Sequence, residues 1–127
     1  MIVVDASALL ALVNREPGWP VVAKEVLDQD TTISAVNYSE VLQKAGRLGI
    51  AAEEIDAQMD IVGVTVSPFT RLDARLAASF YRHRSGLSLA DRVCFSLARS
   101  VAGTVYTADR VWEQRSAEFG VNVVVIR

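Results

Sequence analysis

Five short segments rich in β-branched residues recur along the 127-residue chain, and helix-period segments separate them. The five are nearly continuously apolar, which is typical of strands buried on both faces of a sheet. They cover residues 2–4, 31–34, 64–67, 104–107 and 122–126. The segments with helical periodicity cover residues 6–14, 18–27, 37–48, 52–62, 71–84, 89–102 and 110–119. This alternation predicts an α/β fold of three layers, with helices on both faces of a five-stranded parallel sheet.

The whole chain, residues 1–127, is expected to form one domain. Its length is common for a single domain, and a hydrophobic content of 51% is sufficient for one substantial core. The prolines lie at segment edges, and no repeat, low-complexity tract or linker divides the sequence.

The cysteine and hydropathy patterns predict a cytoplasmic protein with no membrane partner. Cys94 is the single cysteine, so it cannot form an intrachain disulfide, and no zinc-site spacing surrounds it. No secretory signal opens the chain, and no apolar stretch approaches the roughly 20 residues that span a bilayer.

Four acidic residues are expected to meet at one edge of the sheet. Asp5 directly follows the first predicted strand, and Asp109 closely follows the fourth. If the strand order is 3-2-1-4-5, these two strands flank the switch point, where sites of open parallel sheets form outside the carboxyl ends. Glu40 lies early in the helix after the second strand, and Asp91 lies in the first turn of the helix before the fourth.

Each acid also lies where a helix begins, so each has a structural interpretation. Asp5 and Asp109 could be N-caps, and N-Y-S-E (37–40) and S-L-A-D (88–91) resemble capping boxes. Together, however, four carboxylates at one edge repel one another and must either be protonated or hold cations. Mg²⁺ and Mn²⁺ prefer such oxygen ligands and leave positions for a phosphate and an attacking water. The cluster therefore predicts metal-dependent phosphodiester hydrolysis.

Four motifs in a fixed order cover essentially the whole chain: V-V-D-A-S-A-L-L-A-L (3–12), I-S-A-V-N-Y-S-E-V (33–41), G-L-S-L-A-D-R-V-C-F-S-L-A (86–98) and V-Y-T-A-D-R-V-W (105–112). Their order and spacing resemble PIN-domain ribonucleases of the VapC toxin type. The resemblance implies that Asp5, Glu40, Asp91 and Asp109 bind one or two Mg²⁺ or Mn²⁺ ions. It also implies an endoribonuclease that cleaves RNA, forms homodimers and is inhibited by a small cognate antitoxin.

Ser7 is a further catalytic candidate, because it matches the hydroxyl residue that this family commonly has two positions after the first acid. It would assist the metal ligands or the phosphate, or else bond its own helix backbone. Asn37 and Thr107 are weaker candidates for supporting the ligands. The chain departs from some relatives in having Arg110 and Trp112 after the last acid, where a further acid can occur, so a second metal is in doubt.

The charge of the chain is divided unevenly between its halves. Residues 1–63 have a net charge of −6. Residues 64–127 have a net charge of +4, and their positive charges come from arginine. The arginine-rich segment 71–99 could form a rim that faces phosphate, or an ordinary solvated helix face. Arg92 and Arg110, each next to a candidate acid, are the expected substrate contacts.

Three other functions remain to be weighed. A phosphatase using Asp5 as nucleophile usually needs a second aspartate two residues on, where this chain has Ser7. A receiver-like phospho-switch would need an acceptor aspartate after the third strand, and none is there. A catalytically silent docking module would keep the acids only as helix caps. We expect a cytoplasmic Mg²⁺- or Mn²⁺-dependent endoribonuclease that is the toxin of a toxin–antitoxin pair.

Overall fold

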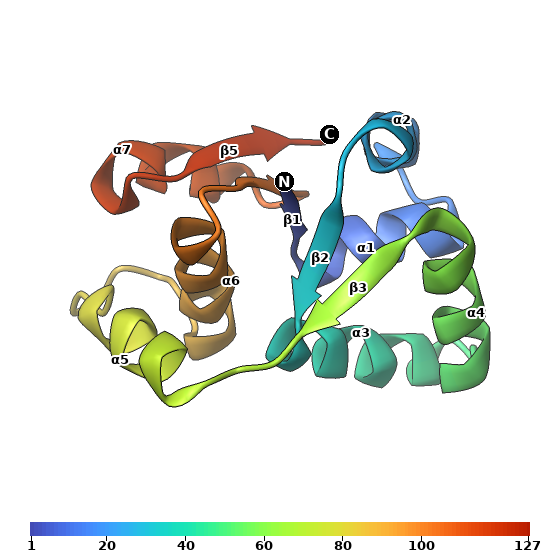
Figure 1. Cartoon of the computed structure of the whole chain (residues 1–127), viewed down its shortest axis with the longest axis horizontal. Helices are drawn as coiled ribbons and strands as arrows, with labels where there is room; N and C mark the ends of the chain where they lie inside the picture. The colour runs from blue at the N-terminus through green and yellow to red at the C-terminus, as the bar shows by residue number, and fades with distance from the viewer.

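A five-stranded parallel sheet lies at the centre of the computed structural model, which describes residues 1–127 (Figure 1). Its strand order is β3-β2-β1-β4-β5, which confirms the predicted order and the parallel arrangement. Each strand is three or four residues long; four have the predicted bounds, and the fifth ends at Val125, one residue before its predicted end. The strands are β1 (Ile2–Val4), β2 (Thr31–Ser34), β3 (Val64–Ser67), β4 (Thr104–Thr107) and β5 (Asn122–Val125).

Helices connect the strands and cover both faces of the sheet. The connections are α1 (Ala6–Asn14), α2 (Trp19–Asp28), α3 (Ala35–Arg47), α4 (Ala52–Val62), α5 (Arg71–Ser79), α6 (Leu89–Ser100), the 3₁₀ helix η1 (Arg110–Arg115) and α7 (Ser116–Phe119). Two predicted helices differ from the structure by more than two residues. The helix predicted for 71–84 ends at Ser79, and the one predicted for 110–119 is divided into η1 and α7.

The early end of α5 has a local cause. The Arg82 guanidinium turns back and donates to the carbonyl of Ser79, the last residue of the helix, and to the carbonyl of Tyr81 just beyond it. Arg84 and Gly86 then adopt left-handed backbone conformations, with φ of 56° and 78°, so the chain leaves the helical path.

Alternate residues of β1 point into two separate cores, as a strand buried on both faces requires. Ile2 and Val4 pack in the larger core with residues of α1, α2, α3 and α4. Val3 points the other way, into a core formed with α6, η1 and α7. Figure 1 shows α5 and α6 on one side of the sheet and α1, α3 and α4 on the other. The three-layer α/β/α architecture therefore follows from the strand pattern.

Aromatic rings fill the second core. Phe95 lies 4.8 Å from Trp112 and 4.9 Å from Phe119 between ring centroids, and Phe80 lies 4.5 Å from Phe119. Each tilted pair of this kind contributes roughly 0.5–1.5 kcal/mol beyond the area that it buries. The cluster fixes α6 and the segment after β4, and both of these carry predicted site residues.

None of the helices combines the length and the apolar character that a membrane-spanning segment needs.

A backbone hydrogen bond places Asp5 beside β4: the Asp5 N–H donates to the Tyr106 carbonyl at 3.2 Å. This bond continues the β1–β4 pairing past the last residue of β1, so Asp5 is held beside the end of β4.

Gly18 offers a test of the packing between the start of α2 and the C-terminal residues. It has a φ of 92°, and a Cβ added there would lie 2.5 Å from the Ile126 carbonyl oxygen. We expect Gly18→Ala to lower the free energy of unfolding by about 2 kcal/mol, because both the left-handed backbone and the contact oppose a side chain.

Gly46→Ala is the matched control, because Gly46 lies in α3 with no atom within 4 Å of the added Cβ. It should leave stability unchanged or raise it by up to about 1 kcal/mol. Chemical denaturation of both variants measures this. Equal stability of the two variants would contradict the close approach at Gly18.

Candidate active site

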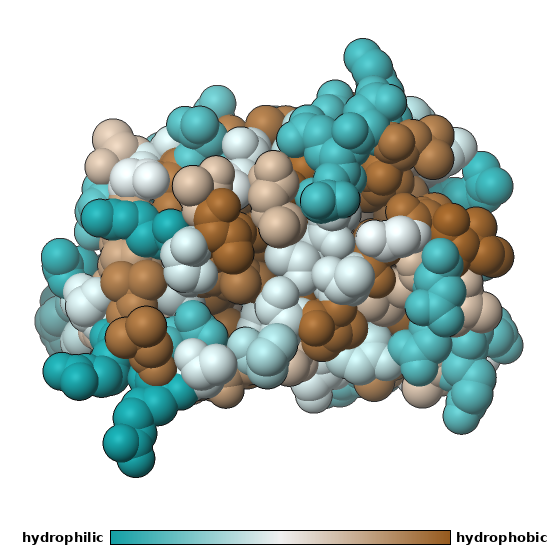
Figure 2. All heavy atoms as spheres, in the orientation of Figure 1, coloured by the Kyte–Doolittle hydropathy of each residue, from teal (hydrophilic) through white to brown (hydrophobic).

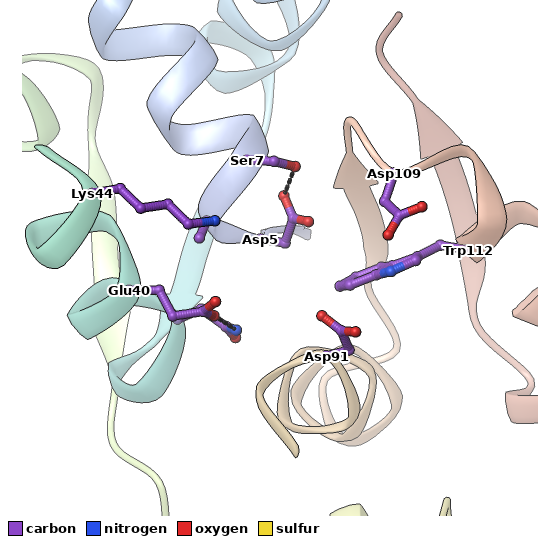
Figure 3. A pocket seen from close by; sticks show the side chains of 9 residues that line it. Asp5, Ser7, Glu40, Lys44, Asp91, Asp109 and Trp112 are labelled. Carbon is purple, nitrogen blue, oxygen red and sulfur yellow. Dashed lines mark hydrogen bonds between the residues drawn. The ribbon is translucent and has the colours of Figure 1, made fainter. Parts of the chain in front are cut away.

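A pocket of about 130 Å³ opens at the carboxyl edge of the sheet and contains all four predicted acids. The acids come from four separate places in the fold: the end of β1, α3, α6 and the segment after β4. Figure 3 shows their carboxylates around one central space. The residues lining the pocket are Asp5, Ala6, Ser7, Asn37, Glu40, Lys44, Asp91, Asp109 and Trp112.

Asp5 is the most buried of the acids, with only 6% of the residue exposed. Its carboxylate accepts three hydrogen bonds, from the Ser7 hydroxyl at 2.7 Å, the Ala8 N–H at 2.8 Å and the Thr107 hydroxyl at 2.6 Å. Burial raises the pKa of Asp5 above its ordinary value, the three hydrogen bonds oppose that rise, and the charge of Asp91 adds to it. The carboxylate is therefore fixed in orientation while its charge stays poorly compensated.

Two hydroxyl groups tie Asp5 to the segment that carries Asp109. Ser7 Oγ donates to Asp5 and accepts from the Ala108 N–H at 2.8 Å. Thr107 Oγ1 donates to Asp5 and accepts from the Asp109 N–H at 3.0 Å. Both hydroxyls therefore hold the two strand ends together, and Ser7 additionally lines the pocket.

The predicted capping roles hold for three of the acids: Asp5, Asp91 and Asp109. The S-L-A-D motif forms a complete capping box between Ser88 and Asp91. The N-Y-S-E motif does not, because α3 begins before it, with Ser34 as the N-cap that accepts from the Val36 N–H. Glu40 consequently lies in the second turn of α3 and caps nothing, so helix capping does not account for this acid.

Asn37 is the partner of Glu40. Its Nδ2 donates to Glu40 Oε1 at 2.9 Å and to the Ala90 carbonyl at 3.0 Å, which joins α3 to the first turn of α6 next to Asp91. Because both acceptors fix the direction of the amide, Oδ1 is the atom left without a partner, in a residue that is 1% exposed. Asn37 therefore sets the spacing between two of the acids and presents an unsatisfied acceptor in a residue that lines the pocket.

Asp91 and Asp109 lie on the other side of the pocket from Glu40 (Figure 3). Burial raises the pKa of Asp91, its hydrogen bonds to Ser88 lower it, and the charges of Glu40 and Asp109 raise it further. Asp109 Oδ1 accepts from the Val111 N–H at 3.0 Å. The charges of Glu40 and Asp109 thus act on Asp91 across the pocket, and the charge of Asp91 acts on Asp5.

The donor set suits a hard divalent cation. As the side chains are placed, no three His, Cys, Asp or Glu residues converge closely enough to hold a metal ion. The pocket nevertheless presents four carboxylates and no sulfur or imidazole, which is the ligand chemistry of Mg²⁺ and Mn²⁺. A cation among them would offset both the burial of Asp5 and the mutual repulsion, so the residues fit such an ion once acids other than the fixed Asp5 carboxylate rotate toward it.

The sequence analysis did not predict three of the residues that line the pocket, and besides Ala6 these are Lys44 and Trp112. Lys44 follows Glu40 by four residues in α3, and that spacing places both on one helix face. Trp112 is 2% exposed and belongs to the second core, yet its indole also forms one wall of the pocket. The i,i+4 spacing was a usable signal for Lys44, whereas nothing local indicated Trp112.

The two arginines predicted to contact substrate have other partners. Arg92 Nη1 donates to the Ala77 carbonyl at 3.0 Å, and its guanidinium lies 5.3 Å from the centre of the Tyr81 ring. Arg110 Nε donates to the Arg127 carbonyl at 3.0 Å. Neither lines the pocket, and their contact with substrate stays a prediction.

The chain belongs to the PIN domain family, whose family model matches residues 2–118. No curated protein matches the chain in sequence.

Several solved structures share its fold. VapC20 of Mycobacterium tuberculosis, described as a Sarcin-Ricin loop cleaving toxin, is 20% identical with a TM-score of 0.69, and the match covers 87% of this chain and 91% of that one. A toxin–antitoxin complex from Klebsiella pneumoniae matches at 16% identity and a TM-score of 0.71 over 100% and 98%. FitAcB from Neisseria gonorrhoeae matches at 17% identity and 0.67 over 97% and 96%. At these identities the likeness shows the fold.

The raised pKa values of Asp5 and Asp91 predict how stability depends on pH without divalent metal. The folded state binds these protons more tightly than the unfolded chain, in which an aspartate has a pKa near 3.8. Stability from these groups is therefore lost as the pH rises from about 4 through the raised values. Asp5→Asn mimics the protonated acid, so it should melt above the wild type at pH 7 by roughly 4 °C or more.

Thermal melts in EDTA between pH 4 and pH 8 measure this difference, which should shrink toward pH 4. Asp60→Asn, on the exposed face of α4, is the control and should track the wild type at every pH. A difference between Asp5→Asn and wild type that stays constant with pH would show that the Asp5 charge is not the cause.

Proposed function

We propose that this protein is a divalent-metal-dependent endoribonuclease and that it is the toxin of a toxin–antitoxin pair. The observation that carries the proposal is the gathering of four carboxylates from four separate elements in one pocket of a PIN domain. Structural neighbours support it, because they include a toxin described as cleaving the Sarcin-Ricin loop and a toxin–antitoxin complex.

In this proposal, Asp5 and Asp109 would hold the main Mg²⁺ or Mn²⁺ ion, and a bound ion would supply Lewis acidity toward the phosphate and toward the attacking water. Asp91 and Glu40 complete the set of ligands or orient the attacking water. Ser7 supports Asp5 through the hydrogen bond between them. A single metal is sufficient for this assignment.

The rest of the chain keeps these groups in position. Thr107 and Ser7 prevent the Asp5 carboxylate from rotating, and Asn37 holds Glu40 at a fixed distance from α6. The buried Trp112 indole forms an apolar wall that limits water on one side of the pocket. Preorganised groups of this kind need little rearrangement when substrate binds, which is a main source of catalysis at such sites.

Glu40 separates the nuclease from a non-catalytic docking module. A docking module needs three of the acids as helix caps, and the structure shows those caps. It has no use for the Glu40 carboxylate, which caps no helix and belongs to neither core. The nuclease proposal accounts for all four acids, so it is preferred.

The proposal includes a small cognate antitoxin as partner, a homodimer and a cytoplasmic location. One neighbouring structure is described as a toxin–antitoxin complex, which supports the partner. A mainly apolar groove of about 210 Å³ lies among α1, α2 and α4, and Figure 2 shows hydrophobic residues gathered on that side of the molecule. Such a groove suits an apolar segment of a protein partner. It is lined by Leu12, Val13, Arg15, Trp19, Ala23, Gln58 and Val62.

Cleavage of total cellular RNA by the purified, antitoxin-free protein tests the activity. With Mg²⁺ or Mn²⁺ we expect discrete fragments, and EDTA should abolish them. Asp5→Asn should reduce cleavage at least a hundredfold, because it weakens cation binding at the most constrained ligand. Asp60→Asn is the matched control and should cleave like the wild type. Wild-type activity in Asp5→Asn would refute the site, and a protein that neither cleaves RNA nor binds Mn²⁺ would favour the docking module.

The chemistry of the fragment ends tests the mechanism separately. In the proposed in-line displacement a water oxygen bonds to phosphorus, the bond from phosphorus to the 3′-oxygen breaks, and that oxygen takes a proton. The products should carry 5′-phosphate and 3′-hydroxyl ends, which end labelling and sequencing of the fragments can establish. Fragments with 2′,3′-cyclic phosphate would show that the ribose 2′-hydroxyl attacks, and would exclude the water mechanism.

A further inference from the structure

The acidic pocket should repel RNA, which is the substrate in the proposed function. Four carboxylates line it, whereas each phosphodiester group of an RNA strand carries a negative charge. One divalent cation offsets only part of the acidic charge. A strand that enters the pocket therefore needs a cationic group of the protein near its phosphates.

The arginines do not supply this group within the pocket. None of the eleven lines it, and several are held by backbone carbonyls elsewhere. Arg92 donates to Ala77 and Arg110 to Arg127, as described above. Four more donate to carbonyls of other residues: Arg82, Arg99, Arg115 and Arg127.

Lys44 is the one cationic residue that lines the pocket. It lies on α3 one turn after Glu40, its side chain is exposed, and it takes part in none of the three ion pairs of the chain. Figure 3 shows its ammonium group reaching into the pocket from the side of α3, opposite Asp91, Asp109 and Trp112. The ammonium group is therefore free to bind an anion without breaking an existing ion pair.

We propose that Lys44 binds a non-bridging phosphate oxygen of the RNA strand and so holds the strand against the acidic pocket. This inference rests on the proposed function and adds to it the residue that receives the phosphate. A lysine ammonium is a compact charge with three donors, so it can contact phosphate without demanding one fixed geometry. Lys44 lies across the pocket from Asp91 and Asp109, so an RNA strand bound to its ammonium group would lie between Lys44 and those two acids.

Binding of a fluorescein-labelled single-stranded oligoribonucleotide, followed by fluorescence anisotropy in Ca²⁺ at several salt concentrations, tests the proposal without requiring cleavage. Lys44→Met should weaken binding about tenfold, because one charged hydrogen bond is lost. The slope of log K against log salt should fall in magnitude by about 0.7, the value for one phosphate contact on a single strand. Lys44→Arg should restore both quantities.

Lys24→Met is the matched control, because Lys24 is the only other lysine and is exposed on α2. It should bind RNA like the wild type. Mn²⁺ titration and thermal melting complete the set: Lys44→Met should bind Mn²⁺ at least as tightly as the wild type and stay folded, since it removes a positive charge beside the acids.

Wild-type affinity and salt slope in Lys44→Met would overturn the proposal, as would a wild-type protein that binds no RNA. The outcome is separable from that of the nuclease assignment. A wild type that binds RNA through Lys44 but never cleaves it would leave this inference standing and refute the activity. If the wild type cleaves RNA and Lys44→Met binds and cleaves it equally well, the nuclease activity is supported and the role of Lys44 is refuted.

Discussion

The carboxylate of Asp5 is buried at the end of the central strand, and much of the surrounding structure serves to keep it there. Three hydrogen bonds reach it from α1 and from the end of β4, so the same contacts that satisfy the charge also align β1 with β4. Burial still raises its pKa, which means that the folded protein tolerates an incompletely compensated charge at this position. A protein selected for stability alone would have an amide or an apolar residue at this position. The unfavourable buried charge of Asp5 therefore indicates that the charge has a function.

Patterns local in sequence predicted most of the fold. Continuous β-branched runs indicate strands buried on both faces of a sheet. Parallel strands need crossover connections such as the helices between them, and this requirement leaves few possible sheet topologies. The convergence of Asp5 and Asp109 follows from that topology, because both follow strands that lie side by side at the switch point. The boundaries of α5 and of η1 were less accessible, since they depend on how Arg82 and Asp109 use their side chains at helix ends.

The electrostatic part of the site was harder to predict, because its determinants are contacts between residues far apart in the chain. Arg92 was expected at the substrate from its place beside Asp91, but its hydrogen-bond acceptor is the Ala77 carbonyl, which no sequence pattern marks. The role of Asn37 depends on the Ala90 carbonyl, 53 residues away. A guanidinium or an amide has several possible partners, and only the packed structure decides among them.

The bonds that join Asp5 and Ser7 to residues 107 and 108 connect positions about one hundred residues apart in the chain. Local helices can form early during synthesis, but a contact of this separation forms only after most of the chain has been made and β4 has joined the sheet. The Asp5 carboxylate is therefore synthesised well before the neighbours that orient it. For a nuclease proposed to act inside the cell that makes it, this order of assembly delays a harmful activity until the segment that carries Thr107 and Asp109 has been made and has joined the sheet.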